Sequence, residues 1–542
     1  MRRMSPRSEP GWAPVATGPV AIFFSAALAA IAAYYAAFIA RTSFFIGPAR
    51  YFPLLDDAMV SMRYARHLVQ GQGFVWNLGD PPLEGFTNPL WTLVMAAVHL
   101  LPLPQTRMTL AVQAIGAAIL LALLVTVFRL GTWLQQSAEP AAGRPNARPG
   151  ASSPAAPFAA MILAGFYWPL VYWTLEGMEV GLLALIVTNA AVALVTGRRI
   201  LIAYLVLGIG TFVRTDFLVV LLAFALAGAL LDPARRRAHL GLGIGVAVAA
   251  ASLQTGARLL YFHDPLPNTY YLKLTGYPVA LRVARGAWVL AQTVARSNGL
   301  LLVLPAAAIA LASGEARRRQ LLLLTPLFAQ AAYSVWVGGD AWEGEIPCNR
   351  YLAVAMPLLF VAAMRPIARL AAWLDPRARL GAAPALAVTA AVTLAVAPWR
   401  TTLMVAPLPY LLKDRDLTVR ALAARQLLRP EGSVAATGVG TIGYYSERRI
   451  VDLLGKCDRH VARLPMRRAI RQNPLTYFLP GHLKWDYAWS IGELKPDLVA
   501  QLWEYPEKAR PYLSDYVVMT TTVGGEPLQM AARRGSPRVV WP

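Results

Sequence analysis

Long apolar runs separated by short polar turns recur along the first four hundred positions, for example at residues 20–40, 240–261 and 380–398. Each run has about the 20 apolar residues that a helix needs to cross a bilayer. Such runs must be helical in lipid, because a hydrocarbon core cannot satisfy free backbone N–H and C=O groups. The pattern predicts a polytopic α-helical membrane protein with about eleven transmembrane helices.

Clusters of arginine between these runs orient the helices, because cytoplasmic loops carry an excess of Lys and Arg. The clusters 198–199, 235–237 and 317–319 all lie on the cytoplasmic side if the N-terminus is cytoplasmic and the first apolar run is an uncleaved signal anchor. The expected spans are 20–40, 109–132, 158–174, 180–196, 201–213, 217–231, 240–261, 288–312, 321–337, 351–371 and 380–398.

This topology places residues 41–108 outside the cytoplasm as a long first loop. Segment 89–101 within it is apolar but short for a span, so it is predicted to be interfacial or re-entrant. Residues 262–287 and 338–349 form the second and third external loops. The transmembrane domain is therefore expected to cover residues 1–398.

The tail, residues 399–542, is more polar and is predicted to fold as a small α/β domain on the extracytoplasmic face. Gly438, Gly440 and Gly443 form a GxGxxG pattern, which is weak evidence for dinucleotide binding when it stands alone. Asp452 follows too early to bind a ribose, so the pattern is interpreted as a tight turn. The segments with the residue pattern of strands are 433–436, 449–453 and 515–520.

The composition agrees with a membrane protein, because 57% of the 542 residues are hydrophobic and the mean hydropathy is +0.46. A net charge of +22 would indicate nucleic-acid binding in a soluble protein. Here many arginines lie between apolar runs, where they orient helices and contact anionic headgroups, so no nucleic-acid partner is predicted. Cys348 and Cys457 both fall in predicted external segments, which is compatible with one disulfide or with two free thiols.

Acidic residues are scarce and collect on the predicted outer face. Carboxylates near a membrane are costly unless they are solvated, paired or functional, so their convergence suggests an active site. The alternative is that loops are simply where charges can lie. The acidic residues in question are Asp56, Asp57, Glu84, Glu176, Glu179, Asp216, Asp264, Asp340, Glu343 and Glu345.

The pair Asp56–Asp57 is the strongest local signal. It opens the amphipathic stretch DDAMVSMRYARHLVQGQG, and acids at a helix start favour the helix dipole. One Asp is enough for that role, so the second is better explained by chemistry. It suits a general base for an acceptor hydroxyl, with its neighbour holding a metal or orienting the acceptor. A divalent cation is compatible with the pair, but the pair does not require one.

Four basic residues also fall on or near the predicted outer face: Arg63, Arg214, Lys273 and Arg350. Departure of a lipid phosphate leaves negative charge, which Arg or Lys can stabilise. Contact with lipid headgroups or pairing with a nearby acid is the structural alternative, and Arg214 could simply pair with Asp216.

Several segments resemble a bacterial branch of the GT-C glycosyltransferase superfamily. That branch includes the arabinofuranosyltransferases that add terminal arabinose to mycobacterial cell-wall polymers. The first loop and the LPNTYY-K stretch are the most specific parts of the resemblance. The segments are 56–91 (DDAMVSMRYARHLVQGQGFVWNLGDPPLEGFTNPLW), 173–185 (WTLEGMEVGLLAL), 211–219 (TFVRTDFLV), 264–273 (DPLPNTYYLK), 338–352 (GGDAWEGEIPCNRYL), 440–460 (GTIGYYSERRIVDLLGKCDRH) and 480–486 (PGHLKWD).

The resemblance implies a GT-C membrane fold, a polyprenyl-phosphate-linked sugar donor and an acidic catalytic residue in the first loop. On that pattern Asp56 is the expected base, with Asp57 in support, and a bacterial inner-membrane enzyme would transfer arabinofuranose to an envelope glycan or glycoprotein. The expected ligands of the donor phosphate are Lys273, Arg350 and Arg63. The expected substrate-binding residues are Glu84, Asn88, Glu176, Arg214, Asp216, Asn268, Tyr270, Asp340 and His482.

The sequence departs from the family pattern at two places that bear on the sugar pocket. Asp340 is followed by Ala341 and Trp342 where Met-Pro is common, and Thr215 stands where Pro usually separates the Arg and Asp of the Arg-x-Asp pair. Two other functions stay open. A transporter or flippase would need paired helix breaks in two matching halves, which the sequence does not show. A polysaccharide polymerase or ligase would share the lipid donor.

Overall fold

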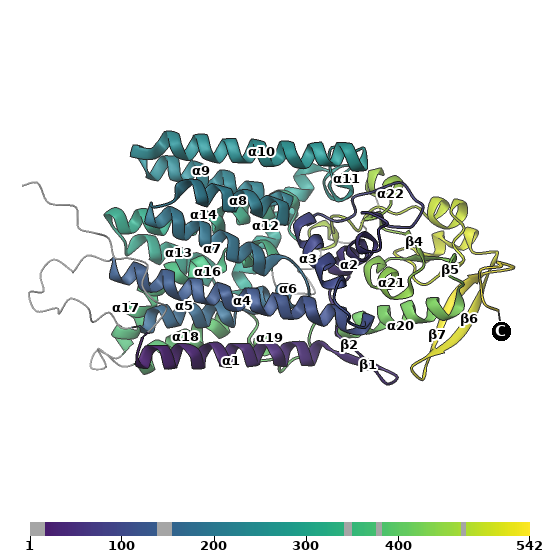
Figure 1. Ribbon diagram of the computed structural model, residues 1–542, viewed down its shortest axis with the longest axis horizontal. Helices are drawn as coiled ribbons and strands as arrows, with labels where there is room; N and C mark the ends of the chain where they lie inside the picture. Colours follow the sequence, from purple (N-terminus) through teal and green to yellow (C-terminus); the bar gives the residue numbers. More distant parts are fainter. Residues whose placement is uncertain (1–16, 138–153, 341–348, 375–381, 468–472, 542) are drawn as a thin grey trace, which may run out of the picture.

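The computed structural model describes residues 17–137, 154–340, 349–374, 382–467 and 473–541. A bundle of long helices forms one part of the molecule, and a mixed helix–sheet domain covers one end of it (Figure 1). The helices of the bundle are α1 Pro19–Thr42, α4 Gln105–Gln136, α5 Ala155–Gly165, α6 Trp168–Leu175, α7 Val180–Thr196, α8 Ile200–Val213, α9 Leu218–Leu231, α10 Arg236–Phe262, α12 Val279–Arg296, α13 Leu300–Ala310, α14 Gly314–Val337, α15 Arg350–Ala353, α16 Met356–Ala362, α17 Met364–Leu374 and α18 Ala382–Val396.

Length and hydropathy make several of these helices able to cross a bilayer. Among the described residues, 4 helices satisfy both criteria alone, and 2 bent helix pairs bring the total to 6 if each pair is one span. The 4 single helices are Pro19–Thr42, Gln105–Gln136, Pro233–Phe262 and Gly314–Val337. The chain is a helical membrane protein, and the exact number of spans stays a prediction.

Three of the spans that we expected as continuous helices are broken. Helices α5 and α6 meet at 48°, because Pro169, the second residue of α6, cannot donate a backbone N–H to the preceding turn. Helices α12 and α13 meet at 79°, where Asn298 and Gly299 both have left-handed backbone conformations. The expected span 351–371 is divided into α15, α16 and α17, and Pro357 lies at the start of α16.

Part of the expected second external loop is also helical. Helix α11 (Asn268–Leu274) follows α10, and α12 begins at Val279 rather than at the expected residue 288. The buried face of α12 carries Arg282 and Arg285, which explains why a hydropathy argument placed this segment outside a helix of the bundle.

The first loop is ordered at the end of the bundle that the C-terminal domain covers (Figure 1). It contains a short hairpin of β1 (Phe44–Ile46) and β2 (Ala49–Tyr51), followed by α2 (Asp56–Val69) and α3 (Pro89–His99). Helix α3 has 11 residues and packs against α2, so the apolar segment 89–101 is too short to span.

The C-terminal domain is built on a five-stranded sheet with strand order β4-β3-β5-β7-β6. Strand β3 is parallel to both β4 and β5, whereas β7 is antiparallel to β5 and β6. The predicted strand 433–436 is confirmed, and the predictions 449–453 and 515–520 fall on β4 and β6. The elements are α20 Leu411–Leu427, β3 Ser433–Ala436, α21 Val439–Ser446, β4 Arg449–Asp452, α22 Arg459–Arg463, α23 Pro474–Tyr477, β5 Leu498–Val499, β6 Tyr516–Val523 and β7 Glu526–Arg533.

The GxGxxG segment is a helix, not the tight turn that we expected. Its residues form α21, which connects parallel strands β3 and β4 and packs against α2 of the first loop. A Cβ on Gly440 would lie 2.0 Å from the backbone oxygen of Asp56, and one on Gly443 would lie 2.8 Å from Nη1 of Arg63. The glycines therefore allow two helices to approach closely, which is a packing role rather than a nucleotide-binding one.

Candidate active site

A cavity of ≈330 Å³ lies where the first loop, the ends of the membrane helices and the C-terminal domain meet. Helices α2, α9, α11, α14 and α15 contribute to its walls, and the loop after β4 contributes Lys456. Of the site residues expected from the sequence, those that line the cavity are Asp57, Asn88, Arg214, Asp216, Tyr270, Lys273, Asp340 and Arg350.

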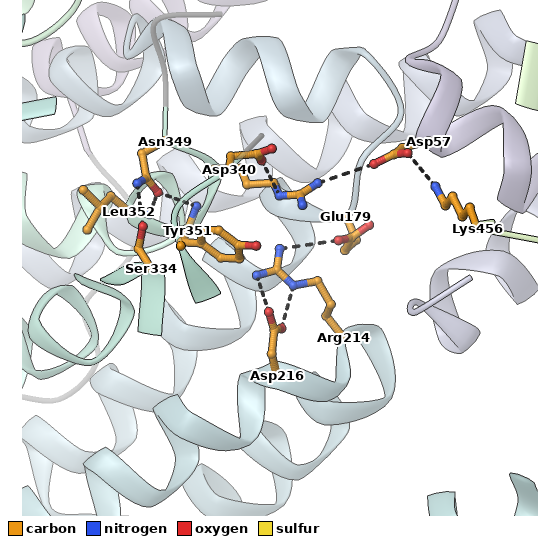
Figure 2. Close-up of polar contacts among 12 residues, drawn as sticks. Asp57, Glu179, Arg214, Asp216, Ser334, Asp340, Asn349, Tyr351, Leu352 and Lys456 are labelled. Atoms are coloured by element: carbon orange, nitrogen blue, oxygen red, sulfur yellow. Dashed lines mark hydrogen bonds and ion pairs between the residues drawn. The ribbon is translucent and has the colours of Figure 1, made fainter. Parts of the chain in front are cut away.

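One end of the cavity gathers cations around the carboxylate of Asp57 (Figure 2). Lys456 Nζ lies 2.5 Å from Oδ1 of Asp57, and Arg350 Nη1 lies 3.8 Å from its Oδ2. Arg350 Nε also pairs with Asp340 Oδ2 at 2.7 Å. Lys273 lines the same cavity.

The charge state of Asp57 is set by the cations around it. Burial alone would raise its pKa, but Lys456, Lys273 and Arg350 outweigh burial and hold the pKa of Asp57 well below its ordinary value. Asp57 is therefore a carboxylate at neutral pH. Burial and the neighbouring Arg350 lower the pKa of Lys273 to about 8, so this lysine is mostly charged at pH 7.

A chain of polar side chains forms another part of the wall (Figure 2). Arg214 Nε lies 2.6 Å from Asp216 Oδ1, and Arg214 Nη1 lies 3.6 Å from Glu179 Oε1. Asn88 Nδ2 donates to Glu179 Oε2 at 2.9 Å, and the Ser61 hydroxyl donates to Asn88 Oδ1 at 2.9 Å. Converging donors and acceptors of this kind can recognise a hydroxyl-bearing ring.

Much of the remaining wall is apolar, although threonine and tyrosine side chains also line it. Such surroundings exclude water and strengthen the electrostatic interactions of the polar groups. The apolar lining residues are Phe86, Met178, Leu218, Val219, Leu266, Leu274 and Val337.

Helix α2 turns its two adjacent acids in different directions. Successive residues of an α-helix are about 100° apart around its axis, since one turn takes about 3.6 residues. Asp57 lines the cavity, whereas Asp56 Oδ1 accepts the backbone N–H of Thr441 at 2.8 Å, from the first turn of α21. The N-cap of α2 is Leu55, whose apolar side chain makes no capping hydrogen bond, and both acids lie in the first turn. Asp56, the base favoured by the sequence, therefore contacts the C-terminal domain and is not among the lining residues.

Arg63 has a different position from the one we expected. Its buried guanidinium donates to the backbone oxygens of Trp76, Gly443 and Arg448 and to Oδ1 of Asn77. Two of these acceptors belong to the C-terminal domain, so Arg63 fastens that domain to the first loop. It does not line the cavity, and its donors are occupied by protein, so it is not placed to hold a donor phosphate.

Two of the expected acidic ligands are buried away from the cavity. Glu84 is buried and pairs with Arg258 Nε at 2.7 Å. Glu176 is buried at the end of α6, and its backbone oxygen accepts the N–H of Leu55 at 3.0 Å. Neither residue lines the cavity. Their predicted position outside the cytoplasm was the reason to expect them in the site, and that position alone does not identify a ligand.

Asn268 and His482 lie behind the lining. Asn268 binds the loop that carries Lys456, through backbone oxygens of that loop. His482 packs its ring against Trp503 with centroids 5.8 Å apart. Burial and the charge of Lys273 lower the pKa of His482 to about 4, so the ring is neutral at pH 7.

The acidic groups of the cavity are each paired with a cation of the protein: Asp57 with Lys456, Asp340 with Arg350, and both Asp216 and Glu179 with Arg214. Within the described ranges, no group of three or more His, Cys, Asp or Glu side chains could hold a metal ion. Glu343, Glu345 and Cys348 lie outside those ranges, and with them the disulfide that the sequence allowed. Cys457 is buried, and a Cβ on Gly85 would lie 2.5 Å from its sulfur.

Comparison with solved structures gives a match over nearly the whole chain. The crystal structure of ArnT from Cupriavidus metallidurans bound to undecaprenyl phosphate has a TM-score of 0.53 and 13% sequence identity, covering 95% of this chain and 98% of that one. The chain has the GT-C fold. The apo state of the same ArnT has a TM-score of 0.48 at 13% identity, covering 94% of this chain and 97% of that one.

Two other comparisons are less informative about function. The Archaeoglobus fulgidus oligosaccharyltransferase complex with Zn and sulfate has a TM-score of 0.48 at 11% identity, covering 94% of this chain and 73% of that one. A sequence family described as a domain of unknown function, DUF8728, matches residues 413–539. No curated protein sequence matches the chain.

Sequence reasoning missed two main residues of this candidate site. Glu179 was recognised as an outer-face acid but was not assigned to the substrate, although it faces the cavity beside Asn88. Lys456 was not singled out at all. Its signals were its place within the resembling segment 440–460 and just after a predicted strand, at the edge where the carboxyl ends of parallel strands meet.

Proposed function

We propose that this protein is a membrane glycosyltransferase that transfers a sugar from a polyprenyl-phosphate donor to a hydroxyl of an envelope glycan or glycoconjugate. The observation that carries the proposal is the cavity in which Asp57 faces Lys273, Arg350 and Lys456. The GT-C fold supports it, as does the undecaprenyl phosphate bound by the structurally similar ArnT.

The cationic end of the cavity suits the donor phosphate. Lys273 and Arg350 would bind the phosphate oxygens and stabilise the negative charge that grows as the lipid phosphate departs. Arg350 is held in place by Asp340, so less of its side-chain freedom is lost on binding.

Asp57, rather than Asp56, is the better candidate for the general base, because it is the one that lines the cavity. The bond between the anomeric carbon and the phosphate oxygen breaks, the acceptor oxygen forms a bond to that carbon, and the acceptor proton passes to Asp57. Lys456, Lys273 and Arg350 hold the pKa of Asp57 low in the empty site. A bound phosphate would share these three cations and so weaken their effect on Asp57. The carboxylate then becomes more basic when the donor is present.

The Asn88–Glu179–Arg214–Asp216 chain is the proposed binding site of the sugar hydroxyls. Arabinofuranose is the favoured sugar, and this choice rests on the sequence resemblance. The same resemblance favours a bacterial inner-membrane location with the cavity on the extracytoplasmic face.

The test compares purified Asp57→Asn, Asp56→Asn and the wild type, with a labelled polyprenyl-phosphate arabinose and crude envelope glycan. Loss of a general base lowers the rate by about 100-fold or more. We expect that loss for Asp57→Asn. Asp56→Asn should keep transfer within about tenfold, because the amide oxygen of Asn can still accept the Thr441 N–H.

Asp515→Asn is the matched control, because Asp515 is exposed on the C-terminal domain. If Asp56→Asn abolished transfer while Asp57→Asn kept it, the assignment of the base would be reversed. If the wild type transferred no sugar from a panel of polyprenyl-phosphate pentoses and hexoses, the proposed function would be wrong.

A further inference from the structure

The loop of residues 453–458 follows β4 and enters the cavity from the C-terminal domain. It carries Lys456, which lines the cavity together with Pro480 of the same domain. Lys456 is the charged side chain that the described part of the C-terminal domain contributes to a cavity built mainly by the membrane helices and the first loop.

The backbone of this loop is held from its own domain by Asp452. The buried carboxylate accepts the N–H groups of Leu454 at 2.9 Å, Gly455 at 3.0 Å and Cys457 at 2.6 Å. Gly455 has a φ of 83°, and a Cβ there would lie 2.8 Å from the backbone nitrogen of Ala462. The loop therefore has a fixed conformation that a side chain at Gly455 would disturb.

The same backbone is held from the membrane domain by Asn268 of α11. Its amide nitrogen lies 2.9 Å from the carbonyl oxygen of Gly455, 3.0 Å from that of Lys456 and 3.2 Å from that of Asp458. Asn268 is buried, and its own N–H donates to the backbone oxygen of Glu84 at 3.0 Å. Each domain therefore binds one set of the loop's peptide groups: Asp452 binds the N–H groups, and Asn268 binds the C=O groups.

This double attachment fixes where the side chain of Lys456 begins, and its ammonium group ends at Oδ1 of Asp57 (Figure 2). A lysine needs no such support to make a surface ion pair, since exposed pairs form and break freely. The attachment of the loop by Asp452 and Asn268 is explained if the ammonium group of Lys456 must stay at one point of the cavity while it exchanges Asp57 for another partner.

We propose that Lys456 is a ligand of the donor phosphate and that Asp452 and Asn268 are its positioning residues. In the empty site Lys456 pairs with Asp57, and when the phosphate enters, its oxygens become partners of the ammonium group. The C–O bond to the phosphate then breaks, the phosphate keeps the bonding electrons, and Lys456 stabilises the resulting charge together with Lys273 and Arg350. The C-terminal domain is in this way part of the catalytic centre. This inference rests on the proposed function.

The test measures binding of a polyprenyl phosphate, and of the corresponding polyprenol without phosphate, to the full-length protein in detergent. We expect Lys456→Met to weaken binding of the phosphate by about tenfold or more, because a charge-assisted hydrogen bond is lost. Binding of the polyprenol should not change. Lys456→Arg should restore much of the phosphate affinity, whereas Lys495→Met, on an exposed lysine of the same domain, should bind like the wild type.

The positioning role has its own readout. Asn268→Ala should weaken phosphate binding, because it misplaces the ammonium group of Lys456. In the Asn268→Ala background, Lys456→Met should then cause no further loss of phosphate affinity, because the misplaced ammonium group no longer contributes. Additive effects of the two changes would overturn the role of Asn268. Thermal unfolding shows which variants are folded. If Lys456→Met does not fold, the phosphate affinity of Lys456→Arg is compared with that of the wild type instead.

The outcomes separate the two proposals. If the wild type binds polyprenyl phosphate and Lys456→Met binds it equally well, Lys456 is not a phosphate ligand and this inference is wrong, while the proposed function stands. If the wild type binds the phosphate no better than the polyprenol, the proposed function and this inference fail together.

Discussion

Asp56 and Asp57 are neighbours in the chain but serve different parts of the molecule. Asp56 accepts a backbone N–H of the C-terminal domain, and Asp57 faces the cavity beside Lys273, Arg350 and Lys456. The sequence placed two acids at the start of an amphipathic helix, which was enough to predict a site there. It was not enough to choose between the two acids, because that choice depends on what packs against each side of the helix.

The same limit applies to the basic residues. Lys273 and Arg350 could be predicted because they lie in or beside the predicted external loops, and both line the cavity. Lys456 could not, because its partner Asp57 is 399 positions away in the sequence. Arg63 shows the converse case, since a basic residue on the right face is used to join two parts of the protein.

Lys273 leads to a prediction about pH. Its pKa is lowered to about 8, first by burial and then by Arg350, so it loses its charge as pH rises through about 8. Only the charged form binds phosphate well, so the affinity for polyprenyl phosphate should fall as the pH rises through about 8. The measurement is the Kd from pH 6 to 10.

Lys273→Arg is the control for this pH profile. Arginine stays charged throughout that range, so the decline above pH 8 should disappear. A decline that persisted in Lys273→Arg would assign it to another group, and Lys484 is the first to examine, since burial lowers its pKa to about 8 as well.

At the scale of elements, strands and long helices were predictable and their interruptions were not. The strand 433–436 and helices α10 and α14 follow directly from apolar patterning. The bend between α12 and α13 depends on two left-handed residues, Asn298 and Gly299, in an otherwise apolar region. The mean hydropathy of a window of about 20 residues changes little when two residues within it break the helix, so the apolar pattern does not reveal the bend. The GxGxxG segment likewise forms a helix because Gly440 and Gly443 face α2, a contact that the local pattern does not contain.

Gly440 provides a test of this helix contact. In Gly440→Ala the added Cβ would lie 2.0 Å from the backbone oxygen of Asp56, which cannot move without moving α2. Overpacking of this kind costs about 1–3 kcal/mol. We therefore expect a lower melting temperature and weaker transfer, because α2 also carries Asp57.

The matched control for Gly440→Ala is Gly245→Ala on α10, where an added Cβ meets nothing within 4 Å. Alanine in a helix is favoured over glycine by about 0.5–1 kcal/mol, so this variant should be as stable as the wild type or more stable. Equal melting temperatures for both variants would show that α2 and α21 do not pack as closely as described.

For the whole molecule, the basic turns and the C-terminal domain belong to opposite ends of the helix bundle, whose arrangement Figure 1 shows. Arg235 donates to the backbone oxygen of Gly197, and Arg318 pairs with Asp232 at 3.0 Å, so three short basic turns lie together. The cavity and the C-terminal domain lie at the other end. This arrangement agrees with the positive-inside rule and supports the proposal that the cavity is extracytoplasmic.

Reporter fusions test that orientation. A phosphatase that is active only outside the cytoplasm, fused after residue 542, should be active in cells, whereas a fluorescent protein that matures only in the cytoplasm should be dark at the same position. Inserted in the turn at 198–199, the two reporters should behave in the opposite way, since that turn lies at the basic end. Identical behaviour at both positions would contradict an extracytoplasmic cavity. A reversed result would place Asp57 in the cytoplasm, where the sugar donor would have to be sought among cytoplasmic compounds.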